Sequence, residues 1–299
     1  MRRALIAAAL AAACGFARAG DALLFDDFSY PSAEALAQGG WSLRAHAGHP
    51  GVPGARWDPA GIAVVDDPDR AANRLLRLRA QTDGRPDGTA QAQICHARKY
   101  LRGTYAARVR FRDTPVSGID GDPVVQTFYA VAPLAHDFDP HFSEVDWEYL
   151  ANGGWGAEPT RLYAISWQTV RIEPWLAVNS EQQIAGSLDG WHTLVVQVGE
   201  HAVRMFLDGR QVARHAGRNV PVVPMSINFN LWFSPAGLLA PTPEPRVWQQ
   251  DVDWVLHVRD RLLSPAEMNA TVTRLRRQGV ARQDTVPATD PPLASDCSF

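Results

Sequence analysis

The distribution of apolar positions along the chain predicts a protein built mainly of β-strands. From Leu23 onward, short apolar or alternating runs are separated by Gly, Pro, Asn and Asp, which is the pattern of a β-sandwich. In the run 105–112, apolar side chains alternate with arginines, as in a sheet that buries one face. The expected strands are 62–65, 75–80, 90–95, 105–112, 124–131, 144–150, 162–167, 191–198, 202–207, 225–232 and 252–258.

Helical signals are confined to a short turn near 32–38 and to one later segment. Ser264-Pro265-Ala266-Glu267 supplies a cap residue, a first-turn proline and an acid three residues on, and the helical run reaches Gln278 with Gly279 as its stop. Residues 283–299 are rich in Pro, Asp and Ser, which predicts an extended tail whose role the sequence does not define. Because no linker interrupts the strands, we expect one domain over 20–262, followed by the helix and tail over 263–299.

Composition and charge exclude several classes of partner. The chain has 299 residues, is 46% apolar and carries a net charge of -3, which is ordinary for a globular protein. Its basic residues are scattered, so neither a nucleic acid nor an anionic membrane surface is indicated as a partner. We expect a monomer.

Residues 1–19 have the three parts of a secretory signal. Arg2 and Arg3 precede an apolar run, and Ala17-Arg18-Ala19 is a small-x-small cleavage site. The sequence therefore predicts a secreted or periplasmic protein, cleaved near Ala19. Lipid attachment at Cys14 is the less favoured alternative, because Ala11 stands where a larger aliphatic residue is usual. No later run is long enough to span a membrane, so no membrane-embedded domain is expected.

Two cysteines remain after the signal segment. In an oxidising compartment, Cys95 and Cys297 can form one bridge that ties the tail to the domain, and a free, buried Cys95 is the alternative. Their number and spacing fit no usual zinc site, so no metal-ligating residues are assigned.

The segment Phe142 to Leu150 carries the candidate chemistry. Side chains alternate across a strand, so Glu144, Asp146 and Glu148 share one face while the residues between them face a core. Crowded carboxyl groups disfavour one another's ionisation, and glycoside hydrolysis needs one protonated and one ionised carboxyl together. Spacing alone leaves two alternatives open, a solvated strand face and a loose cation site.

This segment resembles the Glu-x-Asp-x-Glu signature of glycoside hydrolase family 16. Further segments are similar to that family's motifs in the same order along the chain. They are Gly103 to Arg110, Val124 to Val131, Trp191 to Leu194 with Met205 to Gly209, Pro224 to Trp232, and Asp251 to Val255.

The resemblance implies an all-β fold, a two-sheet, concanavalin A-like jelly-roll sandwich with a sugar cleft on its concave side. The lichenase or endo-β-glucanase branch is the most similar. Carried over, Glu144 would be the nucleophile and Glu148 the acid and base, with Asp146 tuning the proton affinities of both. Trp147 departs from the family's usual isoleucine, and the segment between Trp155 and Ser187 matches no branch well.

Sugar rings present a flat C–H face, so aromatic platforms are expected in the cleft. Trp232 is the first candidate for substrate binding, followed by Trp155 and Trp167. Core packing is expected for Trp147, Trp191 and Trp254.

No cofactor is required by this chemistry. The resemblance allows a structural Ca²⁺ with Asp253 as one ligand, although no further ligands are identified. His192 is expected to be a hydrogen-bonded structural residue rather than a base.

The sequence therefore predicts a secreted retaining endo-glycosidase that acts on a β-linked, β-glucan-like polysaccharide. Two alternatives stay open, a non-catalytic carbohydrate-binding jelly roll and a transglycosylase with the same site. Mixed-linkage glucan, laminarin, xyloglucan and galactan backbones all fit the sequence.

Overall fold

The computed structural model describes residues 20–156 and 159–298. The signal segment, its cleavage site at Ala19 and Cys14 therefore lie outside the described residues. Within the described part of the chain, no helix has the length and apolar character needed to cross a membrane.

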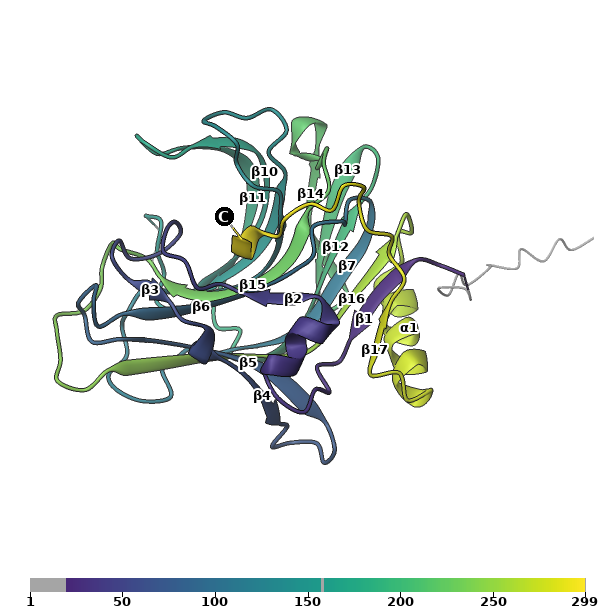
Figure 1. Cartoon of the computed structure of the whole chain (residues 1–299). Helices are drawn as coiled ribbons and strands as arrows, with labels where there is room; N and C mark the ends of the chain where they lie inside the picture. Colours follow the sequence, from purple (N-terminus) through teal and green to yellow (C-terminus); the bar gives the residue numbers. More distant parts are fainter. Residues whose placement is uncertain (1–19, 157–158, 299) are drawn as a thin grey trace, which may run out of the picture.

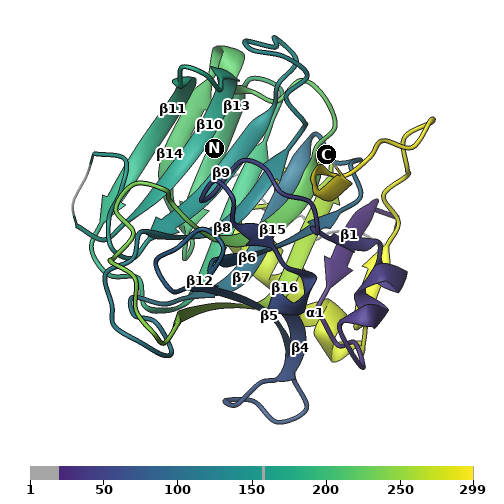
Figure 2. The same cartoon turned by 60° about the vertical axis from the view of Figure 1, so that its left-hand side comes forward.

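Two antiparallel sheets lie one over the other, and the first of them is concave (Figures 1 and 2). In spatial order its strands are β11 (Leu176–Ala185), β10 (Arg161–Arg171), β9 (Glu144–Leu150), β8 (Val124–Val131), β15 (Ser226–Phe233), β6 (Ala90–His96) and β2 (Trp41–Leu43). The strand with the three acids is therefore an inner strand, with partners on both edges.

The second sheet is convex and is organised along one long strand, β16 (Arg246–Arg259). In spatial order its strands are β14 (Arg210–Ala216), β13 (Ala202–Leu207), β12 (Gly190–Val198), β7 (Gly103–Phe111), β16, β5 (Arg74–Thr82) and β4 (Ile62–Asp66). Beyond β5, the same edge of β16 continues with β1 (Leu23–Asp26), which in turn pairs with β17 (Arg282–Asp284). The remaining elements are β3 (Arg56–Trp57), parallel to β6, and the 3-10 turns η1 (Glu34–Gly39), η2 (Pro59–Gly61), η3 (Gly217–Asn219) and η4 (Asp296–Ser298).

The main core fills the space between the sheets. The inward face of β9 contributes Val145, Trp147 and Tyr149, which are all buried there. Because successive side chains alternate, burying these three residues directs the acids of the same strand to the concave, outer side. The packing of β9 thus fixes the direction of its carboxyl groups.

A second apolar cluster lies outside the convex sheet, under the helix α1 (Pro265–Arg277; Figure 1). Ser264 accepts a hydrogen bond from the Glu267 backbone while the Glu267 side chain bonds back to Ser264, which is the capping box expected from the sequence. The helix buries Met268, Val272 and Leu275 against the sheet.

The outer face of β7 is only partly exposed. The alternation predicted a solvated face opposite the core, but Ala106 of that face is buried beneath the α1 cluster. A small side chain is what allows the helix to approach, and Arg108 and Arg110 on the same face of β7 are half-buried.

The all-β, two-sheet jelly roll with a short helix is confirmed, and each expected strand is present within a few residues. Strands that the sequence did not predict are β1, β2, β3, β11, β14 and β17. The core prediction is confirmed for Trp147 and Trp254, whereas Trp191 is half-buried, with the Arg108 guanidinium 4.6 Å from its ring centroid.

Candidate active site

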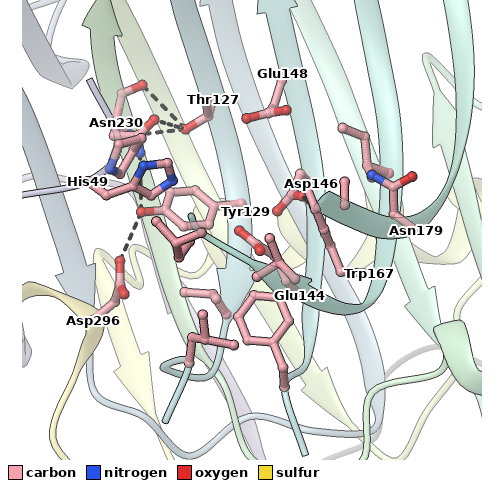
Figure 3. Close-up of a pocket in the computed structure, with 18 of the residues that line it drawn as sticks. His49, Thr127, Tyr129, Glu144, Asp146, Glu148, Trp167, Asn179, Asn230 and Asp296 are labelled. Carbon is pink, nitrogen blue, oxygen red and sulfur yellow. Dashed lines mark hydrogen bonds between the residues drawn. The ribbon is translucent and has the colours of Figure 1, made fainter. Parts of the chain in front are cut away.

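The concave sheet forms the floor of a cleft of about 690 Å³, and the three acids lie in its centre (Figure 3). Strand register gives each acid at least one polar or aromatic neighbour on an adjacent strand. The cross-strand neighbours on β8 and β10 are Val131 and Trp167 for Glu144, Tyr129 and Ile165 for Asp146, and Thr127 and Tyr163 for Glu148.

Asp146 is the most buried of the three acids, with 2% of its surface exposed. Trp167 donates its indole N–H to Asp146 Oδ2 at 2.5 Å. Asp146 Oδ1 is buried and accepts no hydrogen bond from the described residues. Burial, and then the charge of Glu144, raise the pKa of Asp146 well above its usual range. The Trp167 hydrogen bond opposes this rise, because it stabilises the ionised form of Asp146.

Glu144 and Glu148 are half-buried, so both can meet a substrate. Burial raises the pKa of Glu144, and Glu148 and Asp296 raise it further by like-charge repulsion. Burial raises the pKa of Glu148, with further repulsion from Asp146 and Glu181. No Lys or Arg is among the described residues that line the cleft, so no basic side chain there offsets these charges.

A polar network on β8 and β15 continues the floor beside the acids. Thr127 donates its hydroxyl to Asn230 Oδ1 at 2.5 Å and accepts the Asn230 backbone N–H at 3.0 Å. The Asn230 amide donates to the Tyr129 hydroxyl at 3.2 Å. The sequence analysis missed these residues, although the alternation of both strands places them on the same face as the acids. They offer fixed hydrogen-bonding groups to a sugar.

The candidate platforms differ in exposure. Trp232 lines the cleft, but only 7% of its surface is exposed, because it packs in a cluster with Trp57 and Tyr163. Trp155 lines the cleft with 46% of its surface exposed. Trp167 is half-buried beside Asp146. A stacking role for Trp232 stays a prediction, since its ring is mostly covered by protein.

The sequence analysis missed Trp175, which lies at the turn between β10 and β11. It is 53% exposed, lines the cleft and meets the Trp167 ring edge-on at 6.1 Å. Its ring also lies 5.6 Å from that of His49, which comes from the loop after β2. Trp175 falls in the segment that resembles no branch of the family, so no motif could identify it.

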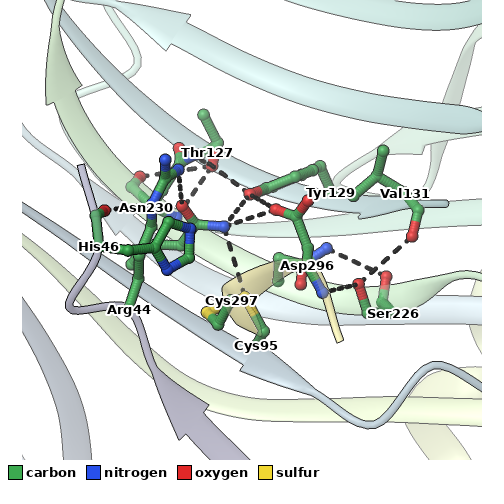
Figure 4. The surroundings of a disulfide bond; sticks show 12 residues. Arg44, His46, Cys95, Thr127, Tyr129, Val131, Ser226, Asn230, Asp296 and Cys297 are labelled. Carbon is green, nitrogen blue, oxygen red and sulfur yellow. Dashed lines mark hydrogen bonds between the residues drawn. A yellow bond between two sulfur atoms is a disulfide. The ribbon is translucent and has the colours of Figure 1, made fainter. Parts of the chain in front are cut away.

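Cys95 and Cys297, whose pairing the sequence left open, form a disulfide. Cys95 lies on β6 and Cys297 in η4, so the bridge fixes the end of the predicted tail to the concave sheet. Asp296, also in η4, lines the cleft (Figure 4). The tail, which its composition predicts to be extended, thus contributes a carboxyl group to the candidate site.

Asp253 and His192 lie on the convex sheet. Arg276, Arg108 and Arg70 all bond to the Asp253 carboxylate, at 2.7, 3.0 and 3.3 Å. These guanidinium groups supply the positive charge that a bound cation would bring, so Ca²⁺ at Asp253 stays a prediction that this geometry disfavours. No group of three or more His, Cys, Asp or Glu side chains among the described residues is arranged to hold a metal. His192 lies 2.7 Å from Asp208 Oδ2, as expected for a structural residue.

Comparisons with known proteins give a fold but no relative by sequence. No family profile matches the chain, and no curated protein is similar to it in sequence. A glycoside hydrolase family 16 endo-glucanase from Bacteroides ovatus superposes with a TM-score of 0.58 at 15% identity, covering 77% of this chain and 98% of its own. A β-glucanase from Bacillus licheniformis gives 0.55 at 16% identity, covering 81% and 100%. LamA from Zobellia galactanivorans, in complex with laminaritriose and laminaritetraose, gives 0.57 at 13% identity, covering 82% and 100%. The chain therefore has the jelly-roll fold of glycoside hydrolase family 16, as the resemblance in its motifs implies.

Proposed function

We propose that the protein hydrolyses a neutral, β-linked glucan with retention of the anomeric configuration. The observation that carries this proposal is the set of three carboxyl groups on one face of β9, at the floor of a cleft, with raised pKa values and no lining Lys or Arg among the described residues. Burying acids without a cation is costly, and glycoside hydrolysis is a chemistry that uses such a group.

The three acids take different roles in this proposal. Glu148 carries a proton at neutral pH and donates it to the leaving glycosidic oxygen while the Glu144 carboxylate attacks the anomeric carbon. The ionised Glu148 then removes a proton from water, the water oxygen bonds to the anomeric carbon, and Glu144 leaves as a carboxylate. Protonated Asp146 would use its unpartnered Oδ1 to donate a hydrogen bond toward Glu144, which keeps the charge on Glu144.

The lining of the cleft supports a neutral polymer. Recognition of anionic sugars requires cations, and the described lining residues include neither Lys nor Arg. Exposed rings of Trp155 and Trp175 suit the flat C–H faces of glucose units. The solved structures of similar fold include β-glucanases and a protein bound to laminarin oligosaccharides, which supports β-glucan as the first substrate to test.

Action outside the cytoplasm is part of the proposal. A disulfide between Cys95 and Cys297 is typical of an oxidising compartment, which agrees with the signal-like residues 1–19.

The test is a panel of soluble polysaccharides assayed for new reducing ends. We expect cleavage of mixed-linkage glucan or laminarin, none of carboxylated or sulfated polymers, and none by the folded Glu144→Gln protein. Cleavage that persists at the wild-type rate in Glu144→Gln would show that Glu144 is not the nucleophile. When an oligosaccharide is added as an acceptor, products longer than that oligosaccharide would instead identify a transglycosylase.

Stereochemistry tests the covalent step separately. If Glu144 forms a glycosyl intermediate, the first product should carry the β anomer at its new reducing end. Proton NMR in the first minutes shows which anomer appears, and initial appearance of the α anomer would contradict retention.

A further inference from the structure

The segment that follows α1 crosses the molecule and ends beside the concave sheet (Figure 1), and it is held at several points. Strand β17 pairs with β1, and Lys99 bonds both to the Asp284 carboxylate and to the Val286 carbonyl. Leu293 then forms a β-bridge with Arg98. We call residues 293–298 the end-wall segment, for the position described next.

The end-wall segment lies over one side of the concave sheet. The disulfide ties Cys297 to Cys95 of β6, and the Gln93 amide on the same strand donates to Asp296 Oδ2 at 2.6 Å. The described lining of the cleft runs from β11 through β15 and then meets Asp296 and, from the loop after β2, His49 to Gly51, but it includes no residue of β6 or β2. The cleft therefore stops where the end-wall segment and this loop cover the sheet.

The opposite side of the cleft has no such cover from this segment. The floor continues there to β11, the edge strand of the concave sheet, whose side chains are exposed or half-buried. A polymer that binds across the strands can extend past β11, but it meets the end-wall segment in the other direction.

Asp296 gives the end wall a polar group that faces the substrate space. Its Oδ2 accepts hydrogen bonds from Gln93 and, at 3.1 Å, from the Tyr129 hydroxyl (Figure 4). Its Oδ1 accepts none from the described residues, which leaves one carboxyl oxygen for a ligand. Tyr129 also joins the Asn230 network beside the catalytic acids, so Asp296 is held in register with the floor.

Resting on the function proposed above, we infer that the end-wall segment closes one end of the cleft and that Asp296 binds a hydroxyl group of the last sugar to fit there. The enzyme then cuts a neutral glucan at a fixed, short distance from one chain end, rather than at random positions as the endo mode expected from the sequence would have it. A volume of about 690 Å³ is in the range of pockets that enclose a small ligand, which agrees with room for only a few sugars.

The test compares early product lengths from a long linear β-glucan for four proteins. They are the wild type, the Cys95→Ser/Cys297→Ser double variant, Asp296→Asn, and Asp290→Asn as the matched control. Asp290 is an exposed acid three residues before the end-wall segment, and it does not line the cleft. Viscosity and reducing ends are followed together, because random cleavage lowers viscosity much faster per bond cut.

We expect one predominant short product and slow loss of viscosity from the wild type and from Asp290→Asn. The double cysteine variant should release a ladder of products and lower viscosity faster, because the end wall can move away. Asp296→Asn should raise KM about tenfold for oligosaccharides long enough to reach it, leave KM for shorter ones unchanged, and change kcat little.

Two controls keep failures distinguishable. If the double cysteine variant does not fold, folded wild type treated with a thiol reductant tests the same release of the segment, alongside Asp296→Asn. A wild type that produces a ladder from the start, unchanged in every variant, overturns the end wall while leaving the glucanase function intact. A wild type that cuts no β-glucan, with the fold verified, overturns the proposed function itself.

Discussion

The carboxyl group of Asp253 and the three carboxyl groups of β9 have opposite surroundings. Asp253, on the convex sheet, bonds to three arginines and to Asn73. Burial alone would raise the pKa of Asp253, but hydrogen bonds and charge from Arg276, with Asn73 and Arg108, hold it below its ordinary value. The acids of β9 have no Lys or Arg among the described residues that line their cleft, and their pKa values rise.

Under the proposed function, the difference separates a structural carboxylate from catalytic ones. Asp253, on β16, bonds to Arg276 of α1 and to Arg108 of β7. Its negative charge is therefore balanced by residues of two neighbouring elements, and the same bonds hold these elements together. The acids of β9 repel one another, and burial and this repulsion raise their pKa values. A fold gains nothing in stability from that arrangement, whereas a proton donor and a nucleophile in one cleft require it.

The largest effect that tests this comparison is on activity. Glu148→Gln should lower kcat/KM by three orders of magnitude or more, about 4 kcal/mol of transition-state stabilisation, because the amide cannot donate a proton to the leaving oxygen. Asp253→Asn should keep kcat/KM per folded molecule within a factor of about two, since Asp253 lies outside the cleft. Initial rates normalised to folded protein give both values. A large loss of activity in folded Asp253→Asn would contradict the distinction between a structural Asp253 and catalytic acids on β9.

The second effect is on stability and has the reverse pattern. Asp253→Asn should lower the free energy of unfolding by about 1–3 kcal/mol, because it removes the counter-charge of Arg276 and Arg108, whose side chains are only partly exposed. Denaturant unfolding measures the loss. Asp66→Asn is the matched control, since Asp66 pairs with Arg74 at 3.6 Å with 92% of its side chain exposed, and it should change stability little. Equal losses in the two variants would contradict the structural role of Asp253.

The third effect is the pH dependence of stability, which should have opposite signs for the two sets. The folded-state pKa of Glu148 lies above its unfolded value, so the stability that this group contributes is full below the unfolded pKa of about 4.3 and is lost as pH rises through the folded pKa. Gln does not titrate, so Glu148→Gln should gain stability over wild type from pH 4 to pH 8, by about 1.4 kcal/mol for each unit that separates the two pKa values.

Asp253 should respond at the acid end. Its folded-state pKa is lowered, so its stabilisation is present above the unfolded pKa of about 3.9 and is lost as pH falls through the folded pKa. The deficit of Asp253→Asn relative to wild type should therefore shrink in strong acid. Thermal or denaturant unfolding across this pH range checks both signs, and a Glu148→Gln protein less stable than wild type at pH 8 would contradict the account.

The smallest effect concerns the neighbour of Glu148. Glu181 raises the pKa of Glu148 by repulsion, after burial and Asp146. Glu181→Gln should therefore move the alkaline limb of the kcat/KM profile to lower pH, and Glu181→Asp, which keeps the charge, should leave it in place. The difference should fade in high salt, and a shift to higher pH would show that another group sets the limb.

The sequence predicts the centre of the site because local alternation determines it. Phe142 to Leu150 reads as a strand with acids on one face, and burying Trp147 on the other face leaves those acids only the cleft side. The expected strands rest on the same alternation. The helix after Ser264 was predictable for a similar reason, because its cap residue and its first turn are consecutive in the sequence.

The walls of the cleft could not be predicted, because distant segments meet there. Strand β11 has no fully buried residue and no apolar alternation, so neither this strand nor Trp175 in the turn before it carried a signal. Asp296 is one of 32 acidic residues, and it lies beside Tyr129 because the Cys95–Cys297 bridge and the Gln93 amide hold its segment there. The sequence left the pairing of the cysteines open because it does not give the distance between the two thiols in the folded chain.

The order in which strands acquire their partners has a consequence for synthesis of the chain. Strands β8, β9, β10 and β11 follow one another and pair as consecutive hairpins, so the face with the acids can form while later residues are still being made. Strand β1 waits for β16, and Cys95 waits 202 residues for Cys297. A nascent chain can therefore present its carboxyl groups in an open trough before the last residues arrive, and the end-wall segment can take its place only after Cys297 has been added.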